Sequence, residues 1–578
     1  MAINQSEVSK LYVALFGRAS EGSGNEYWQT QSSLTSAADS MLGTSAASDY
    51  FGASLDTNQA FIEFIYANTL NKTYEEDKGG VDYWTSLLEG DEALSRGEVV
   101  SKLIDAIDSY APTGANYNPD DTVTVNAYKQ FTNRVEVSNY TADTVEVAPD
   151  DYATSLGFNE DLVVTYDDST VLSAKNSIAM MIRTYNIVDT NQSLCYDSTS
   201  GLENSCSNNG YDADYIGNQP SYTLSSSKNI VTDNITSLMW TKSSDIDGDG
   251  VTTDVDDKRS YDDAVSYCSS LSLDGYSDWR LPDIKTLYSL ILFTGEDPSS
   301  YTGTDTSALV TFLDGNFDRA FGDQDAGQRV IDGQYASTTK YVSTTMNGDE
   351  TMFGVNFIDG RIKGYPVQMR GEANEFYVLC TRGEEDYGKN DFVDNNDGTI
   401  TDNATALMWE QDDIKSTDFD DAVQICETST TAGYENWRLP NVKELQSIVD
   451  YSRSPDTTSS AAIDEVFNAT SFSNEDDETD WGYYWSSTTH VNYSGNGVAG
   501  SYVSFGRALG NVNGSILDVH GAGAQRSNPK LSESSDGAQA GIDASDSSTY
   551  YYKGPQGDVL RIDNMIRCVR DVSVSSTL

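Results

Sequence analysis

Apolar residues recur with a helical period in the first quarter of the chain. The first stripe, spaced i, i+3, i+4, i+7 and i+8, consists of Val8, Leu11, Tyr12, Leu15 and Phe16. Two further stripes start at Ile62 and Val99, and Ser95 and Glu98 form a capping-box pattern just before the third. Because this spacing places the apolar side chains on one helical face, residues 1–145 are predicted to form an all-α domain.

After about residue 190 the pattern changes to short alternating runs that are typical of strands. Residues 335–339 and 353–357 are examples, and they have counterparts at 484–488 and 502–505. Helices are expected just before and just after each copy of the tetrapeptide Trp-Arg-Leu-Pro. Helices mixed with short strands in one unit predict a compact α+β domain.

The tetrapeptide reveals a duplication. Trp279-Arg280-Leu281-Pro282 recurs as Trp437-Arg438-Leu439-Pro440, and Thr-Asp-Asn and Leu-Met-Trp motifs precede both copies in the same order. Such self-similarity at long period indicates one domain used twice. The expected organisation is a helical domain over 1–145, a connector over 146–190 with a helix near 171–183, and two α+β domains over 191–385 and 386–578. Arg280 and Arg438 are interpreted as structural, each paired with a carboxylate or with backbone carbonyls.

The equivalence of the repeats suggests how the cysteines pair. The expected disulfides are Cys195 with Cys206, Cys268 with Cys380, and Cys426 with Cys568, chosen from the fifteen pairings that six cysteines allow. Structural disulfides imply an oxidising compartment. No Cys-x-x-Cys motif occurs, and the only histidines, His490 and His520, lie in polar, Gly-rich surroundings where they are expected to be exposed. No zinc site is therefore predicted.

The charge balance excludes several partners. Asp and Glu number 91 against 35 Lys and Arg, so the formal net charge is -56. Such a chain repels the phosphate backbone of nucleic acids, and it is disfavoured on anionic lipid for the same reason. Two interpretations of the charge stay open. It can serve solubility alone, or it can form surfaces that bind divalent cations.

One loop is a candidate site for a divalent cation. The segment that follows Leu-Met-Trp in the first repeat contains the candidate ligands Asp245, Asp247, Asp249, Asp254 and Asp256. Alternating aspartates place carboxylates on one side of a loop, and interspersed glycines allow it to turn sharply around calcium. The usual Glu at the twelfth position is replaced by Asp256, and the second repeat has no such loop. Calcium binding is the favoured prediction, and an ordinary acidic loop is the alternative.

Neither an export signal nor a membrane span is evident in the chain. The first residues lack a basic start and an apolar core, and no run of about 18 apolar residues occurs. Disulfides without a secretory signal pose a conflict. Either a signal has been removed, or export proceeds without an N-terminal signal, as in type I secretion.

Two passages of the helical region are alike. Residues 11–18 lead to Tyr27 and Trp28, and residues 65–72 lead to Tyr83 and Trp84. This double pattern resembles the DUF4214 family, a helical domain of secreted and surface-associated bacterial proteins. The resemblance implies a region that anchors to cell-surface polysaccharide or to a neighbouring subunit. Core packing is the favoured interpretation of the four aromatic residues, and contact with a glycan or partner is the alternative.

The duplicated domain also resembles a known family. The motifs are residues 397–409, residues 437–445, Tyr484-Trp485-Ser486-Ser487 and Arg567-Cys568-Val569-Arg570. They resemble the DUF1566 (Lcl-like) family, which implies a C-type-lectin-like or formylglycine-generating-enzyme-like fold. Members include adhesins that contact sulfated polysaccharide. The acidic charge of this chain departs from that picture, since a polyanion would need bridging cations.

These observations predict a protein that acts by contact. No Gly-x-Ser-x-Gly motif, P-loop or dinucleotide fingerprint occurs, and two histidines are too few for an iron facial triad, so no enzymatic activity is expected. The favoured hypothesis is an extracellular bacterial surface protein that self-assembles, with calcium, into a layer or fibre as a homo-oligomer or polymer. The alternative is a carbohydrate-binding adhesin that recognises surface or matrix polysaccharide.

Overall fold

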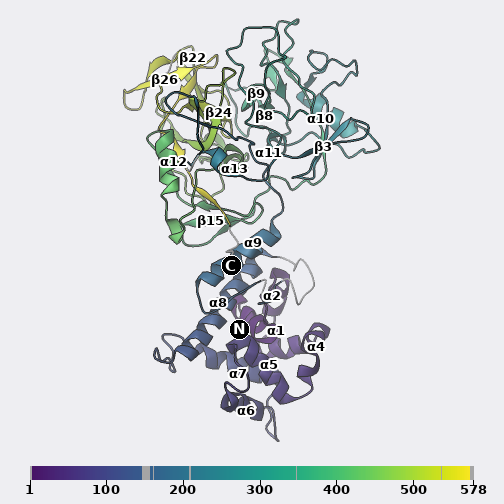
Figure 1. The fold of residues 1–578 in the computed structure, drawn as a ribbon, viewed down its shortest axis with the longest axis vertical. Coiled ribbons are helices and arrows are strands. Elements are labelled where there is room, and N and C mark those ends of the chain that lie inside the picture. Colours follow the sequence, from purple (N-terminus) through teal and green to yellow (C-terminus); the bar gives the residue numbers. More distant parts are fainter. Residues whose placement is uncertain are drawn as a thin grey trace. The chain divides into compact units, whose positions relative to one another are not determined.

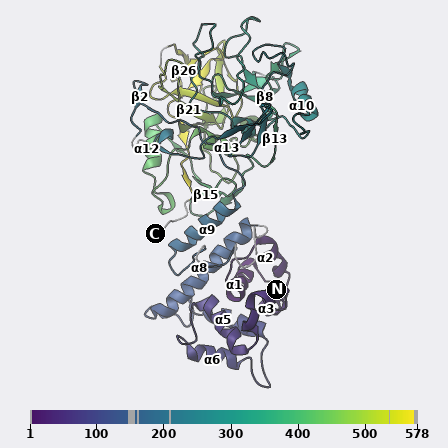
Figure 2. The ribbon, with the colours of Figure 1, turned by 45° about the vertical axis from the view of Figure 1, so that its right-hand side comes forward.

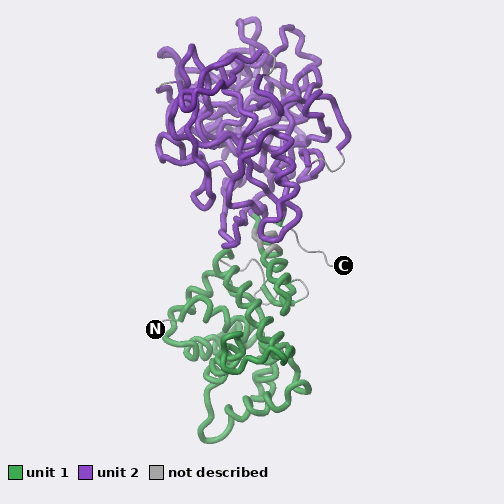
Figure 3. The backbone as a smooth tube through the Cα atoms, turned by 90° about the vertical axis from the view of Figure 1, so that its left-hand side faces the viewer, with its two compact units in different colours: residues 1–183, 572–578 green, residues 184–571 purple. Residues whose placement is uncertain are grey.

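The computed structural model describes residues 3–145, 156–159, 162–206, 210–346, 348–534 and 537–572. The chain divides into two compact units (Figure 3). Unit 1 comprises Met1–Arg183 and Val572–Leu578, and unit 2 comprises Thr184–Asp571. Among the described residues, no helix combines the length and the apolar composition that crossing a bilayer requires.

Unit 1 is helical, as its apolar periodicity predicts (Figures 1 and 2). Its α-helices are α1 (Gln5–Phe16), α2 (Gly22–Gln29), α3 (Leu34–Leu42), α4 (Ser45–Phe51), α5 (Asn58–Leu70), α6 (Lys78–Ser86), α7 (Arg96–Asp108), α8 (Thr122–Thr144) and α9 (Ser169–Ile182). The three predicted stripes lie on α1, α5 and α7 and form one buried core. The side chain of Ser95 caps α7 by accepting a hydrogen bond from the Glu98 N–H at 3.0 Å. This bond satisfies one free donor of the first turn.

The predicted connector is divided between the two units. Its expected helix is α9, which belongs to unit 1, whereas residues 184–190 already belong to unit 2. Residues 146–155 and 160–161 of the connector lie outside the described part of the chain.

Unit 2 combines short helices with strands that pair mostly antiparallel. Its α-helices are α10 (Tyr261–Ser270), α11 (Ile284–Tyr288), α12 (Phe419–Glu427), α13 (Val442–Ser447) and α14 (Pro455–Thr458). Each repeat contributes a four-stranded sheet in the same spatial order. The first is β13 (Thr381–Arg382), β5 (Met239–Thr241), β4 (Ile230–Asp233) and β3 (Tyr222–Leu224). The second is β29 (Val569–Asp571), β16 (Leu407–Glu410), β15 (Thr399–Asp402) and β14 (Phe392–Asp394).

The two repeats share the largest sheet, and this corrects the expectation of two separate domains. In spatial order its strands are β17 (Ile414–Lys415), β28 (Met565–Ile566), β20 (Tyr483–His490), β21 (Ala499–Ser504), β24 (Gln525–Pro529), β9 (Arg361–Pro366), β8 (Thr351–Asn356) and β7 (Gln334–Tyr335). The repeats meet where β24 pairs with β9, at Gln525 and Ile362. A continuous sheet across the boundary makes unit 2 one structural unit.

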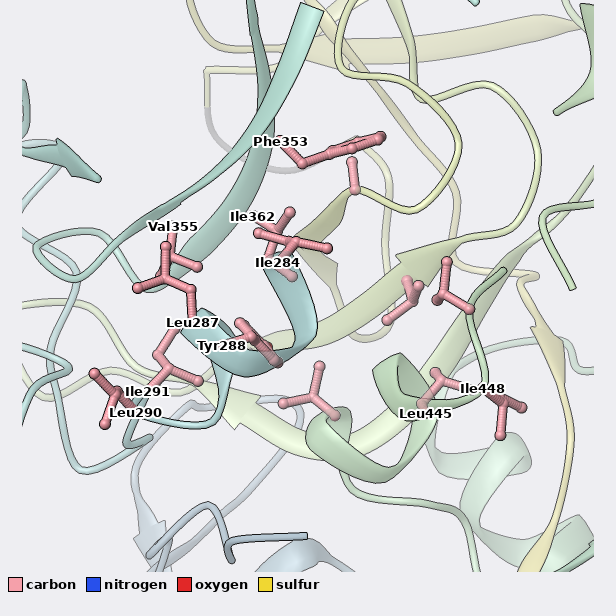
Figure 4. Packing of buried hydrophobic residues seen from close by; sticks show 14 of the residues in the cluster. Ile284, Leu287, Tyr288, Leu290, Ile291, Phe353, Val355, Ile362, Leu445 and Ile448 are labelled. Atoms are coloured by element: carbon pink, nitrogen blue, oxygen red, sulfur yellow. The ribbon is translucent and has the colours of Figure 1, made fainter. Parts of the chain in front are cut away.

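The hydrophobic core of unit 2 also crosses that boundary. Leu287 and Tyr288 of α11 belong to the same buried cluster as Leu445 and Ile448 at α13, and Figure 4 shows the two short helices facing each other. A lysine on each helix, half-buried on α11 and buried on α13, reinforces the contact. Lys285 of α11 donates to the Ser447 carbonyl at 2.6 Å, and Lys443 of α13 donates to the Ser289 carbonyl at 2.8 Å. Each repeat thus satisfies free carbonyls at the helix end of the other.

The three predicted disulfides are confirmed. Cys268–Cys380 and Cys426–Cys568 each join the helix before Trp-Arg-Leu-Pro to the residue just before the closing strand, and Cys195–Cys206 closes a short loop. That loop contains the ladder of β1 (Cys195–Tyr196) and β2 (Glu203–Asn204). Disulfides at equivalent positions reduce the conformational freedom of the unfolded chain in both repeats.

The Gly/Ser/Asn-rich stretch 495–548 divides between two sheets. Strands β21 and β24 belong to the shared sheet. A second sheet has the order β23 (Ser515–Asp518), β22 (Leu509–Val512), β27 (Asp558–Leu560), β26 (Thr549–Lys553) and β25 (Gln539–Ile542). Leu509, Tyr550 and Val559 form its small core. Three two-stranded ladders complete the unit: β6 (Arg259–Ser260) with β12 (Glu375–Phe376), β10 (Gln368–Met369) with β11 (Glu372–Ala373), and β18 (Ser471–Ser473) with β19 (Thr479–Trp481).

Candidate functional site

The aspartate loop between β5 and β6 brings three carboxylates together. One carboxylate oxygen each of Asp245, Asp247 and Asp257 lies within 4.8 Å of the others. Calcium binds oxygen at 2.3–2.6 Å, so ligands that share one ion lie no more than roughly 5 Å apart. The spacing of these three groups therefore fits a single cation of that size.

Backbone N–H groups fix the orientation of the first two carboxylates. Asp245 accepts hydrogen bonds from Gly248 at 2.7 Å and from Gly250 at 3.0 Å, and Asp247 accepts one from Asp249 at 3.0 Å. Gly248 and Gly250 have φ values of +80° and +87°, which a side chain would strain. The alternation of Asp and Gly in the sequence thus builds the turn that holds the acidic groups.

Asp257 is the member that sequence reasoning missed. Its side chain is fully buried, and one carboxylate oxygen accepts hydrogen bonds from the N–H groups of Ile246 at 2.5 Å and Asp247 at 3.3 Å. The other oxygen has no hydrogen-bond partner among the described residues. Burial raises the pKa of Asp257, and the neighbouring carboxylates of Asp254 and Asp245 raise it further. A cation would supply the missing partner and relieve this repulsion.

Of the five predicted ligands, the structure brings Asp245 and Asp247 into the cluster. Asp249, Asp254 and Asp256 lie outside it, and two of them have local roles: Asp249 accepts from the Val251 N–H, and Asp254 accepts from the Asp257 N–H. The spacing of an EF-hand favours the twelfth position, which is Asp256, but this side chain is exposed. Burial, which periodicity does not reveal in so acidic a loop, selects Asp257.

The paired aromatic residues of unit 1 are less buried than expected. Tyr27 and Tyr83 expose 61% and 57% of their surface, so core packing is wrong for both tyrosines. Trp28 and Trp84 are half-buried against the helical core. Each tyrosine meets its neighbouring tryptophan edge to face, at 4.9 Å and 5.1 Å between ring centres. Two similar aromatic edges are therefore accessible on α2 and α6.

A cleft of about 430 Å³ opens where the two repeats meet. Its apolar wall includes Ile284, Phe392 and Val449, and acidic groups outnumber basic ones around it. The residues with charged side chains are Asp283, Glu385, Asp450 and Asp464 against Lys285 and Lys389. Lys285 is half-buried at one side, and burial lowers its pKa to about 8.

Other sequence expectations can be compared with contacts in unit 2. Arg438 forms a buried bidentate pair with Glu444, at 2.6 Å and 2.7 Å, whereas Arg280 donates to the carbonyls of Gly383 and Glu384. Both contacts agree with a structural role. The counterpart of Glu444 in the first repeat is Thr286, which explains why Arg280 takes carbonyl acceptors.

The expectation that both histidines are exposed is wrong. His490 and His520 are each 3% exposed. One ring nitrogen of His490 lies 2.9 Å from the Asp359 carbonyl, and one of His520 lies 3.0 Å from the Asp558 carboxylate. Their polar flanking sequence hides the fact that the shared sheet and its charged residues cover both rings.

The duplicated region matches a known family model. Neither the curated proteins nor the solved structures gave a match to this chain. The family model of the Lcl C-terminal domain matches residues 229–382 and again residues 398–515, one match over each Trp-Arg-Leu-Pro repeat. Unit 2 therefore contains two segments that match this family model, and both contribute strands to one sheet.

Proposed function

We propose that this protein works outside the cell as a structural component that assembles with copies of itself in the presence of calcium. Three disulfides and a net charge of -56 support this proposal. Acidic faces repel one another until divalent cations screen or bridge them. In this proposal the protein acts by contact and not by catalysis.

The observation that carries the calcium dependence is the unpaired, buried oxygen of Asp257 beside Asp245 and Asp247. A buried carboxylate oxygen without a partner is costly, and a bound cation removes that cost. Exposed acidic clusters are common without metal, but Asp257 is buried, leaves one oxygen unpaired and belongs to a cluster with two further carboxylates.

The experiment adds millimolar calcium to the purified, oxidised protein and follows assembly by light scattering and electron microscopy. Ordered sheets or filaments that appear with calcium and dissolve with a chelator are the expected result. Asp257→Asn should weaken calcium binding at least tenfold by calorimetry, whereas Asp256→Asn, which changes an exposed neighbour, serves as the matched control. A protein that stays monomeric at all calcium concentrations would refute the assembly proposal.

The finer proposal for the fold is that each repeat is C-type-lectin-like and that unit 1 is a DUF4214-like anchor. For the repeats, support comes from the helix that precedes Trp-Arg-Leu-Pro, the helix that follows it, and the disulfide from the first helix to the closing strand. For unit 1, support comes from the equivalent positions of Tyr27-Trp28 on α2 and Tyr83-Trp84 on α6.

A second candidate function is a carbohydrate-binding adhesin, and the exposed tyrosines of unit 1 favour it. Tyr27 and Tyr83 offer ring edges at two similar positions, and an aromatic body with a polar tip suits sugar contacts. Retention of the monomer on a glycan array, lost in Tyr27→Ala with Tyr83→Ala and kept in the exposed control Tyr117→Ala, would support this function. Absence of retention on any glycan would oppose it.

A further inference from the structure

The repeats differ in the segment that precedes their first strand. Before β3, residues 184–218 form an extension that we name the arm, and it includes the Cys195–Cys206 loop. Before β14, the second repeat has only the short segment that follows β13. The two strands are equivalent, because Tyr222 pairs with Asp233 and Phe392 pairs with Asp402 in their hairpins. The second repeat therefore lacks a counterpart of most of the arm, and its short segment supplies one equivalent group, the Gly388 carbonyl that accepts from Lys285.

The arm fills a groove between α11 and the second repeat. The Thr190 carbonyl accepts a hydrogen bond from the Phe293 N–H at 2.7 Å. The Gln192 side-chain amide pairs with the backbone of Thr489, accepting from its N–H and donating to its carbonyl, both at 2.8 Å. The Asp189 carbonyl accepts from buried Lys443 at 3.3 Å. The backbone of the arm and one glutamine amide thus satisfy the Phe293 N–H and both backbone groups of Thr489.

The duplication predicts a second groove of the same kind. Phe293 and Tyr451 both lie fourteen residues after the tryptophan of their tetrapeptides, and Lys340 and Thr489 both lie five residues after the tyrosine of equivalent strands. The surrounding hydrogen bonds agree with this alignment. The N–H of Ile284 donates to the Thr339 hydroxyl at 3.0 Å, and the N–H of Val442 donates to the Thr488 hydroxyl at 3.0 Å.

In the second groove, the corresponding backbone groups stay open. The N–H of Tyr451 and both the N–H and the carbonyl of Lys340 have no hydrogen-bond partner among the described residues. Tyr451 and Thr339, the residue before Lys340, line the cleft of about 430 Å³ between the repeats. The cleft is therefore the counterpart of the groove that the arm fills. The Gly388 carbonyl takes the place of the Asp189 carbonyl, and the places of Thr190 and Gln192 are open.

We propose that this cleft binds a peptide of a partner protein in the conformation of residues 190–192, in which Asn191 has a φ of +60°. The peptide carbonyl would accept from the Tyr451 N–H, and a glutamine side chain two residues later would pair with the Lys340 backbone. Main-chain hydrogen bonds supply affinity, and the amide side chain supplies specificity, as in other cases of peptide addition to strand edges. The acidic rim favours a neutral or cationic peptide.

This inference does not depend on calcium or on surface assembly. It rests on the difference between two halves of one unit, one of which contains its own ligand. A sugar would use the carboxylates and rings of the cleft, but it would not require the amide at the position of Gln192.

The test uses the full, oxidised protein and a capped, fluorescent peptide that has the sequence of residues 188–194 with asparagine in place of Asp189, Val-Asn-Thr-Asn-Gln-Ser-Leu, so that it is uncharged apart from the dye. Fluorescence anisotropy should show saturable binding, and replacing glutamine by leucine in the peptide should weaken it at least about tenfold. Ser452→Trp, at an exposed position lining the cleft, should weaken binding to a similar extent. Ser269→Trp, exposed on α10, is the matched control and should bind as the unmodified protein does.

Three results would overturn the proposal. They are no binding up to about 1 mM peptide, equal affinity for the glutamine and leucine peptides, or full binding to Ser452→Trp, which would place the peptide in the groove of the arm or elsewhere. Glycan retention that Ser452→Trp abolishes, without any peptide binding, would reassign the cleft to sugars. If Ser452→Trp fails to fold, Lys389→Trp on the exposed rim replaces it.

Discussion

Replacing Lys443 by methionine tests the central contact between the repeats. The Lys443 ammonium donates to the carbonyls of Ser289 at 2.8 Å, Ile291 at 2.9 Å and Asp189 at 3.3 Å, and the residue is 3% exposed. Methionine keeps the length of the side chain but removes all three donors. Leaving a buried carbonyl without its partner costs about 1–3 kcal/mol. The lysine desolvation cost is recovered at the same time, so we expect a net loss of about 3 kcal/mol.

Lys285 provides the matched comparison. It makes equivalent contacts to the Ser447 carbonyl, the Gly388 carbonyl and the Asn390 amide oxygen, but it borders the open cleft. Water can replace its ammonium there, so Lys285→Met should cost only about 1 kcal/mol. Lys415→Met removes an exposed ion pair with Asp563 and should cost less than about 0.5 kcal/mol.

The assay is thermal and guanidinium unfolding of the oxidised protein, followed by tryptophan fluorescence at pH 6. Burial lowers the pKa of Lys443 to about 7, so its ammonium is largely charged at that pH. Unit 2 spans residues 184–571, and unfolding entropies of roughly 2.1 cal/mol/K per residue convert 3 kcal/mol into a fall of about 4 °C in Tm. Equal losses for Lys443→Met and Lys285→Met, or a larger loss for Lys285→Met, would refute the reasoning.

Three further predictions concern disulfides, a buried ion pair and pH. The loop-closure entropy of a disulfide predicts that replacing Cys268 and Cys380, which are 112 residues apart, by serine lowers the free energy of unfolding by about 4.8 kcal/mol. For Cys195 and Cys206, which are 11 residues apart, the predicted loss is about 2.8 kcal/mol. Equal unfolding midpoints in denaturant for the two double variants would contradict this prediction. Glu444→Gln leaves buried Arg438 with only the exposed Asp571 carboxylate, 3.5 Å away, as a counter-charge. It should cost about 3 kcal/mol in the same assay, whereas a change below about 1 kcal/mol would show that the pair with Glu444 is not needed. Burial lowers the pKa of His490 and His520 to about 4, against 6.5 in the unfolded chain. The unfolded state therefore binds more protons, and stability falls as the pH is lowered from 6.5 to 4, by on the order of 3 kcal/mol per histidine. Burial also raises the pKa of Asp212 and Asp518 to about 7, and this opposes the loss of stability at low pH. The measurement is therefore the difference in Tm between the unmodified protein and His490→Gln. A difference that does not change with pH would contradict the lowered pKa of His490.

The sequence predicts the local elements well because their causes are local. The apolar stripes that start at Val8, Ile62 and Val99 become helices with a common core. The pairing of the two long-range disulfides follows from the repeat, since equivalent cysteines occupy equivalent places in two copies of one fold.

The shared sheet of unit 2 depends on contacts that no local pattern encodes. Pairing of Gln525 with Ile362 joins residues 163 positions apart, and neither strand differs in pattern from one at a free edge. The contacts of Lys285 and Lys443 are equally hidden, because lysine is the residue type least expected in a core. The sequence does indicate these contacts in one way, because Lys285 and Lys443 stand at the same position after the two tetrapeptides.

The same limit applies to the candidate site. The six aspartates of the loop are chemically alike in the sequence, and only burial separates Asp257 from its neighbours. The exposure of Tyr27 and Tyr83 was missed for the opposite reason, since helical spacing of aromatic residues normally indicates a core.

Tandem duplication has a consequence that two separate subunits could not provide. Two identical chains related by a two-fold axis must present every surface twice, and each copy would fill or leave open the same groove. Joining the halves covalently raises their effective concentration, so the contact between them persists without strong affinity. It also frees one half to diverge. A tandem chain of this kind is asymmetric, because one groove is occupied and the other is available. It can therefore recruit a single partner in a single orientation.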